Sequence, residues 1–360
     1  MTWVFAFLGF SVLIILHEAG HFAVAKAVGM RVERFSLFFP PLILRHKGRG
    51  ETEYAIGSIP LGGYVKISGM TPHEELPPGE EHRAYFRQPV WKRVAVIIAG
   101  PVVNILIALV LLTGIILHTG NVTDGSRVDQ VQPHQPATGK LQSGDVIKAV
   151  DGRTGSVDAL SRQIATHGCK GKPTPGCEAV TPTTLTIVRD GRTQTLRIRA
   201  AYDAELRRMR LGFTQSVLRE DVNLPTAVGA SASEMARFTG VTVSTLGRVL
   251  FDAQKRKQVS GVVGSYETAR QAVKINLTTG LYVLAVISLS LGVINLFPFL
   301  PLDGGHIFWA LAEKVRGRAI PFSVMERAGF VGFALVAFLF VIGLTNDIGR
   351  LTGDGFGLGR

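Results

Sequence analysis

The stretch SVLIILHEAGHFAVAKAVG, residues 11–29, decides how this chain is built. It is an apolar run of helical length, yet His17, Glu18 and His21 lie in the middle of it. Ionisable side chains in a segment that could enter a bilayer are costly unless they pair or bind a metal, so they indicate a functional site. A hydrogen-bonded polar cluster between helices is the alternative explanation.

His17 and His21 are four residues apart, so on a helix both imidazoles point to one face. Two imidazoles at this spacing are typical zinc ligands. Glu18 can reach a water molecule on the metal and act as general base while zinc polarises the carbonyl under attack. The H-E-x-x-H pattern is modest evidence by itself, because it fixes only three positions. Its location inside an apolar segment strengthens the evidence for a metal site. The sequence predicts one zinc ion here, with Glu18 as the catalytic residue.

The chain as a whole predicts a polytopic α-helical membrane protein with about four transmembrane helices. Of its 360 residues 46% are hydrophobic and 18% are charged, which indicates membrane segments together with a soluble domain. The segments apolar enough to span a bilayer are roughly 3–25, 94–117, 277–298 and 328–344.

The net charge of +12 fits membrane topology better than nucleic-acid binding, because the basic residues are scattered and no aromatic–basic surface is legible. Lys and Arg are dense over residues 26–93, which the positive-inside rule places in the cytoplasm. The N-terminus and residues 118–276 are then outside. The basic run 255–257 conflicts with this topology, but the first loop is far richer in Lys and Arg.

Residues 121–215 form a soluble domain of short strands in this prediction. Alternating residues flank Asp190-Gly191, which is a hairpin signal. Residues 224–252 have apolar positions at helical spacing, as in an amphipathic helix on the outer membrane surface or a packed linker helix. The Gly-rich tail from 345 to 360 is expected to be disordered. The domains expected are 1–117, 118–215, 216–276 and 277–360.

Residues 35–68 carry β-prone apolar runs broken by prolines and glycines. They predict membrane-associated β-hairpins that partly enter the bilayer, where such backbone must be buried in protein or line a cavity. Gly62 and Gly63 either contact substrate or form a tight turn.

A catalytic zinc needs a third protein ligand, and Asp303 is the candidate. It lies in GVINLFPFLPLDGGHIFWA, at the inner end of the third span and at a depth similar to that of the two histidines. A helix N-cap is the alternative role for Asp303. His306 is a rival ligand, for which a helix-surface or supporting position is favoured.

The motifs together resemble the site-2 protease family, and most closely its bacterial branch of the regulator of sigma-E protease type. HEAGH, NLFPFLPLDGGH and LQSGDVIKAVDGR carry the resemblance. Further matches are PLGGYVK (60–66), AGPVVNI (99–105) and SGVVGSYETA (260–269), the last with Val262 where the family has proline.

The resemblance implies an intramembrane zinc metalloendopeptidase in regulated intramembrane proteolysis, with one zinc ion. Such enzymes sit in the bacterial inner or plasma membrane, with the active site toward the cytoplasm, and cut single-pass proteins such as anti-sigma factors. Carried over, the metal ligands are His17, His21 and Asp303 and the base is Glu18.

Asn295, Pro298 and Pro301 match the family's Asn-x-x-Pro-x-x-x-Leu-Asp-Gly run and are expected to hold an extended substrate. The hairpins at 35–68 could add a strand to that substrate. An interhelical hydrogen bond is the alternative for Asn295. Asn104, with Gly100-Pro101, is expected to serve helix packing.

The outer domain resembles a single PDZ-like α+β domain through LQSGDVIKAVDG. PDZ grooves bind peptides by strand addition, but no carboxylate-binding loop is legible, so a steric filter against bulky substrates is as plausible. The domain could contact substrate or a regulator. Cys169 and Cys177 lie in it, and a disulfide is allowed outside the cytoplasm.

Two other functions fit some of these features. A metal transporter would also place His and acidic residues in spans, but the position of Glu18 and the large outer domain argue against it. The second alternative is a catalytically inactive scaffold that binds membrane proteins through the PDZ-like domain. The intact Glu18 and the three candidate ligands argue against this scaffold function.

Overall fold

The computed structural model describes residues 2–48, 50–70, 74, 76, 78–249 and 251–353. The chain forms two compact units: unit 1 is Met1–Ile115 with Val228–Arg360, and unit 2 is Ile116–Ala227. Each unit has a hydrophobic core of its own.

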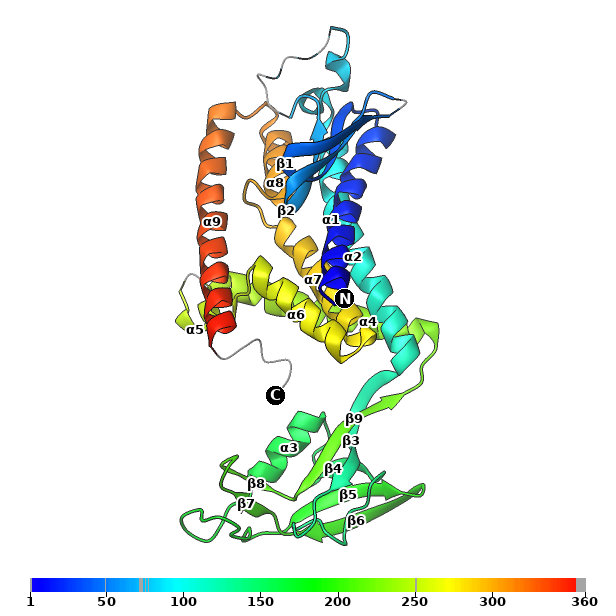
Figure 1. Ribbon diagram of the computed structural model, residues 1–360, viewed down its shortest axis with the longest axis vertical. Helices are drawn as coiled ribbons and strands as arrows, with labels where there is room; N and C mark the ends of the chain where they lie inside the picture. Colours follow the sequence, from blue (N-terminus) through cyan, green and yellow to red (C-terminus); the bar gives the residue numbers. More distant parts are fainter. Residues whose placement is uncertain are drawn as a thin grey trace. The chain divides into compact units, whose positions relative to one another are not determined.

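In the described chain, four helices are long and apolar enough to cross a membrane: α1 (Thr2–Ala27), α2 (Val90–Thr119), α7 (Leu277–Asn295) and most of α9 (Phe322–Thr352) (Figure 1). They coincide with the four predicted spans, by length and composition. Large apolar side chains point outward from them, including Phe330, which is 75% exposed, and Val110, which is 69% exposed. Such faces suit lipid rather than water.

The prediction of a disordered tail from residue 345 is wrong for residues 345–352, which continue α9 as helix. Polar contacts hold this end of α9. Asn346 Nδ2 donates to the carbonyls of Arg256 and Val259, and the fully buried Asp347 accepts from Gly264 N. Composition alone does not reveal these contacts. Residues 354–360 lie outside the described residues.

The segment after α1 forms an antiparallel pair of long, irregular strands, β1 (Val32–Lys47) and β2 (Glu53–Ile67). Ser36 on β1 lies opposite both Ala55 and Tyr64, so part of β1 is sandwiched between the two halves of β2. The predicted β-hairpin structure is therefore present. Met30, Val32 and Ile67 are buried with the adjoining ends of α1 and α2.

Further helices connect the four long apolar ones. They are η1 (Glu81–Arg83), η2 (Tyr85–Arg87), α4 (Leu224–Arg248), α5 (Ala253–Gln258), α6 (Val262–Ile275) and α8 (Asp303–Arg316). Of the two alternatives for residues 224–252, the packed helix fits the structure. Met235 of α4 is buried with residues of α2 and α7, and Tyr282 of α7 donates to Glu234 at 2.9 Å.

Unit 2 is built on an antiparallel sheet of order β6-β5-β4-β3-β9, with α3 (Val157–Ala165) packed against it. Its strands are β3 (Asn121–Val131), β4 (Val146–Val150), β5 (Thr183–Arg189), β6 (Arg192–Ile198) and β9 (Phe213–Glu220), and β7 (Ala201–Asp203) pairs with β8 (Arg208–Arg210). The predicted hairpin is present: Asp190 and Gly191 both have positive φ, as a type I′ turn requires. The expected domain boundary at 215 falls inside β9.

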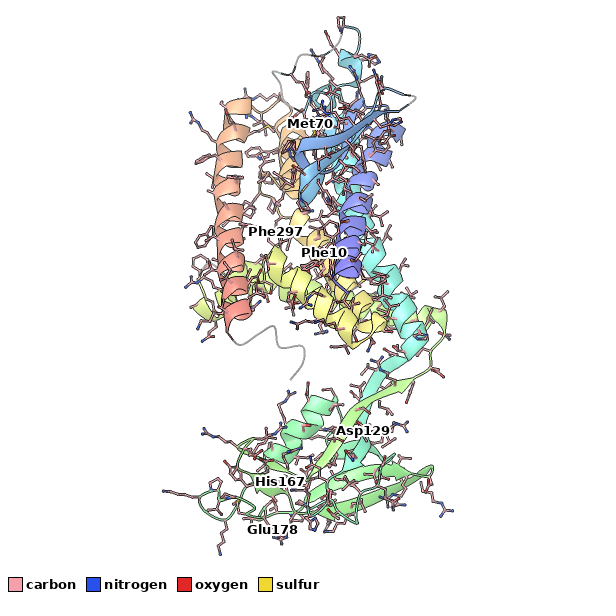
Figure 2. All side chains as sticks on the ribbon, in the orientation of Figure 1. Phe10, Met70, Asp129, His167, Glu178 and Phe297 are labelled. Carbon is pink, nitrogen blue, oxygen red and sulfur yellow. A yellow bond between two sulfur atoms is a disulfide. The ribbon has the colours of Figure 1, made fainter. Side chains whose placement is uncertain are left out.

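Cys169 and Cys177 are joined by a disulfide, with their Cα atoms 6.0 Å apart. His167 and Glu178, labelled in Figure 2, lie just outside the loop that the disulfide closes. His167 is anchored by Asp151, whose Oδ2 is 2.9 Å from His167 Nε2.

Candidate metal centre

Three side chains from two distant parts of the sequence converge in unit 1. His17 Nε2 and His21 Nε2 are 3.2 Å apart, and Asp303 Oδ2 lies 3.3 Å from the first and 3.4 Å from the second. Among the described residues, these three form the one group of His, Cys, Asp and Glu side chains whose ligand atoms could hold a metal ion. The rival ligand His306 is not part of it.

The donor set and its spacing fit zinc. Ligand atoms about 2.0–2.1 Å from a tetrahedral zinc ion lie roughly 3.3–3.4 Å from one another, which matches the three distances seen here. Asp303 Oδ2 is buried and has no hydrogen-bond partner in the described residues. A buried carboxylate oxygen without a partner is costly, and a cation at this point would satisfy it.

The two histidines are oriented by α2. His21 Nδ1 lies 2.9 Å from the Val96 carbonyl oxygen, and His17 Nδ1 lies 3.1 Å from Asn104 Nδ2. A ligating histidine commonly donates its second ring N–H to an acceptor, as His21 can to the Val96 carbonyl oxygen, which fixes the ring orientation and the tautomer. The contact of Asn104 was missed in the sequence, where its only signal was a polar amide within an apolar span.

α1 and α2 cross closely because small residues meet at the site. A Cβ atom on Gly20 would lie 2.8 Å from the Ala99 carbonyl oxygen, and one on Gly100 would collide with the His21 ring. Small residues allow such close approach of helix backbones. The packing role expected of Gly100 agrees with this geometry.

Asp303 reaches the histidines because α8 starts directly against the end of α7. The N-cap of α8 is Leu302, without a side-chain cap hydrogen bond, so the alternative role of Asp303 as N-cap is not realised. A Cβ on Gly304 would collide with the carbonyl oxygens of Leu296 and Phe297. The absence of a side chain at Gly304 therefore allows α8 to begin against the end of α7.

An ion pair between α2 and α8 supports this arrangement. Arg93 donates to both carboxylate oxygens of Glu313, at 3.0 and 2.7 Å, and Arg93 is only 8% exposed. Planar two-point contacts of this kind fix orientation as well as distance. The pair links the helix that orients the histidines to the helix that begins at Asp303.

Glu18 lies beside the metal group and against β2. A Cβ on Gly63 would lie 3.0 Å from Glu18 Cγ, and the Val65 N–H donates to the Glu18 carboxylate. Gly62, the other glycine expected to contact substrate, packs on the Phe39 ring, where a Cβ would lie 2.7 Å from Cε2. The sequence did not predict that β2 would touch Glu18.

The loop between β1 and β2 is anchored to the end of α1 and to η1. Glu51 accepts hydrogen bonds from Arg83, at 2.8 and 2.5 Å, and from Lys26 at 3.0 Å. Arg83, helped by Lys26, lowers the pKa of Glu51 to about 2. This carboxylate is therefore ionised at neutral pH and holds the hairpin to the helix that carries the histidines.

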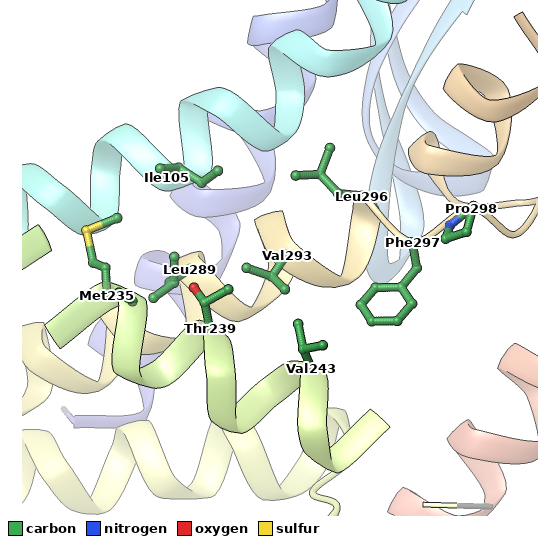
Figure 3. A pocket seen from close by; sticks show the side chains of 10 residues that line it. Ile105, Met235, Thr239, Val243, Leu289, Val293, Leu296, Phe297 and Pro298 are labelled. Carbon is green, nitrogen blue, oxygen red and sulfur yellow. The ribbon is translucent and has the colours of Figure 1, made fainter. Parts of the chain in front are cut away.

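The predicted substrate residues at the end of α7 and after it lie in different surroundings. Asn295 Nδ2 is 3.5 Å from His17 Nε2, beside the metal group. Pro298 lines an apolar cavity of about 460 Å³ (Figure 3). Pro301 follows Leu300, whose backbone packs against Gly332 of α9.

The walls of this cavity come from three helices and from the residues that follow α7 (Figure 3). α4 contributes Met235, Ala236, Thr239 and Val243, α7 contributes Leu289 and Val293, α2 contributes Ile105, and the following residues are Leu296, Phe297 and Pro298. The lining is almost wholly apolar, so the cavity suits aliphatic or aromatic groups.

Comparison with known proteins gives the family. Residues 5–339 match peptidase family M50. The chain belongs to this family. The predicted resemblance to the site-2 proteases is thereby confirmed, and so is the expectation of an enzyme of the peptidase class.

Curated relatives cover most of the chain. Zinc metalloprotease Rip1 of Mycobacterium tuberculosis is 31% identical, over 84% of this chain and 83% of its own. A relative in Brucella suis with a provisional zinc metalloprotease name is 28% identical, over 94% of this chain and 92% of its own. A solved PDZ domain of an SdrC-like protein from Listeria innocua, 20% identical, covers 25% of this chain with a TM-score of 0.21, which carries no argument about the fold.

Proposed function

We propose that this protein is an intramembrane zinc metalloendopeptidase that cleaves single-pass membrane proteins. The convergence of His17, His21 and Asp303 at the spacing of zinc ligands, with Asp303 Oδ2 buried and without a hydrogen-bond partner in the described residues, carries the proposal. When bound there, zinc supplies Lewis acidity at the peptide carbonyl. Membership of a peptidase family favours this function over a metal transporter.

Glu18 is the general base in this proposal. Its carboxylate accepts a proton from the attacking water and later delivers a proton to the leaving amine nitrogen. The Val65 N–H and the close approach of Gly63 hold the carboxylate beside the metal group. Proximity of a fixed base is worth several orders of magnitude in rate.

The substrate is an extended stretch of a membrane-spanning segment. Asn295, beside His17, is placed to hydrogen-bond its backbone, and β2 offers a strand that could pair with it. The apolar cavity at Pro298 would accept apolar side chains, which membrane-spanning segments are rich in. An anti-sigma factor or a similar signalling protein is the substrate class that the family resemblance implies, in regulated intramembrane proteolysis.

The proposed setting is a bacterial inner or plasma membrane, crossed four times, with the active site toward the cytoplasm. Unit 2 is proposed to be a PDZ-like domain on the outside, where its disulfide is compatible with an oxidising environment. It would contact the substrate or a regulator. The dense basic residues between the first two spans support this topology.

Cleavage of a single-span reporter by the purified protein, with bound zinc measured in the same samples, tests the function. Wild type is expected to cut and to hold one zinc ion. Glu18→Gln is expected to hold zinc while cleavage falls by at least about 1,000-fold, because the base is lost and the three ligands remain.

Glu81→Gln serves as the control, because Glu81 is an exposed glutamate on η1. It should cut like wild type. Cleavage by Glu18→Gln at the wild-type rate would remove Glu18 from the mechanism. Absence of zinc from the wild type would reject the metalloprotease.

A further inference from the structure

Asn104 contacts a proposed zinc ligand and is itself completely buried. Its side-chain nitrogen Nδ2 lies 3.1 Å from His17 Nδ1, while its side-chain oxygen Oδ1 is buried without a hydrogen-bond partner in the described residues. A buried amide oxygen without a partner costs about 1–3 kcal/mol. The packing role expected from the sequence does not account for this contact.

The direction of this hydrogen bond depends on what His17 Nε2 is doing. In this contact Asn104 Nδ2 donates, so in a neutral His17 the ring nitrogen Nδ1 must accept and the ring proton must sit on Nε2. Nε2 is the atom that faces Asp303 Oδ2 at 3.3 Å. A protonated Nε2 has no lone pair to offer a metal ion.

Metal binding therefore requires the opposite arrangement at Asn104. With the Nε2 lone pair committed to a metal ion, a neutral His17 carries its proton on Nδ1 and must donate. Rotation of the Asn104 amide by half a turn places Oδ1 where Nδ2 was and supplies the acceptor without moving another group. His21 already has such an acceptor, since its Nδ1 lies 2.9 Å from the Val96 carbonyl oxygen.

We infer that Asn104 is a positioning residue of the zinc site, whose Oδ1 accepts the Nδ1–H of His17 when the metal is bound. The inference rests on the proposed function, because it assumes that His17 is a ligand. It assigns the two histidines different supports: the α2 backbone holds His21, and a replaceable side chain holds His17. Outer contacts of this kind commonly contribute 10–100-fold to metal affinity.

Zinc affinity of the full-length protein in detergent, measured by competition with a chelator, tests this. Asn104→Leu has a similar volume and no acceptor, and its zinc affinity should fall by about 10–100-fold. Asn104→Asp keeps the acceptor and loses the donor, so it should stay within about threefold of wild type. The absorption spectrum of the cobalt-substituted protein should change in Asn104→Leu and not in Asn104→Asp.

Ser288→Ala is the matched control for packing. Ser288 is also fully buried, and its hydroxyl donates to the Asn104 backbone carbonyl at 2.9 Å without touching His17. Its zinc affinity should equal that of wild type, and thermal unfolding of all variants should confirm that they are folded.

Equal zinc affinity in Asn104→Leu and wild type would overturn the inference. So would an equal loss in Asn104→Leu and Asn104→Asp with Ser288→Ala unaffected, because then the donor nitrogen would be the atom that matters. Both results leave the proposed function standing. Only a wild type without zinc would reject the proposed function itself.

Discussion

At the scale of single residues, Gly63 is the least obvious part of the site. It bears no functional group, yet it lies where β2 meets Glu18. A Cβ there would lie 2.9 Å from the Ser36 carbonyl oxygen, 3.0 Å from Glu18 Cγ and 3.2 Å from Ile14 Cγ2. The first of these atoms is backbone, so the pairing of β1 and β2 would have to shift, and the tight contact would push on the Glu18 side chain as well.

Gly63→Ala is therefore expected to lower kcat for reporter cleavage by about 10–100-fold, since small displacements of a catalytic group are that costly. Bound zinc should remain at the wild-type level, because the change touches none of the three proposed ligands, His17, His21 and Asp303. Gly50→Ala is the control, as a Cβ at Gly50 would meet nothing within 4 Å. A wild-type kcat in Gly63→Ala would show that the base tolerates displacement.

The sequence indicates a functional side chain wherever placing that side chain in its apolar surroundings costs free energy. His17, Glu18, His21 and Asp303 are polar groups in apolar segments, which is why they were found. Asn104 gave the same signal but was assigned to packing, because the sequence does not say which ring an amide on another helix will face. Val65 was missed because a backbone N–H leaves no mark in the sequence.

At the scale of elements, the crossing of α1 and α2 determines the shape of the metal group. Gly20 meets the α2 backbone and Gly100 meets the two imidazoles, so each helix offers a small residue at the contact. Pairs of small residues are a common device for close helix contacts in membranes. The sequence supplied the glycines, but their pairing across the helices required the structure.

Gly100→Ala is expected to lower zinc affinity by at least about tenfold, because its Cβ would collide with His21 Nε2 and lie 2.8 Å from His17 Cε1. The loss matches what disturbed ligand orientation usually costs. Gly114 lies on the same helix, where a Cβ would meet nothing within 4 Å, so the Gly114→Ala variant should bind zinc like wild type.

Since both substitutions raise helix propensity equally, the difference in zinc affinity between the two variants isolates the contact with the histidines. Equal zinc affinities in the two variants would contradict the proposed role of the crossing.

At the scale of the whole molecule, the four helices that are long and apolar enough to cross a membrane follow from hydropathy, because each is one long apolar run in the sequence. Hydropathy did not predict that the end of α9 packs against residues 256–264, around the start of α6. That contact depends on three polar side chains, Asn346, Asp347 and Arg350, which bind residues 256–264. In a Gly-rich tail, composition points to disorder, and tertiary hydrogen bonds override it.

Unit 2 has a core of its own, and one buried acid predicts how its stability depends on pH. Asp145 is 2% exposed and accepts two hydrogen bonds from Arg189, at 2.7 and 2.6 Å, and one from Gln142 N. Burial raises the pKa of Asp145, but Arg189 and the Gln142 N–H outweigh it, and the pKa lies below the usual 3.8. A carboxyl with a lowered pKa contributes stability above its unfolded-state pKa and loses that contribution as the pH falls through its folded-state pKa.

Asp145→Asn should therefore lower the free energy of unfolding of unit 2 at pH 6 by roughly 1.5–3 kcal/mol, the usual contribution of hydrogen bonds to a charged group, because Asp145 is buried while the Arg189 side chain is 20% exposed. The gap between wild type and variant should narrow as the pH falls below about 4, where the unfolded carboxyl becomes protonated. Denaturant titration of the full-length protein, followed by the methyl resonances of the buried Ile147 and Ile187, measures the free energy of unfolding and its dependence on pH.

Asp190→Asn is the control, because Asp190 is exposed in the hairpin turn and this substitution should leave the free energy of unfolding nearly unchanged. A gap that stays constant down to pH 3 would mean that the ion pair does not contribute through its charge, and that Asp145 stabilises unit 2 by hydrogen bonding that the asparagine fails to reproduce.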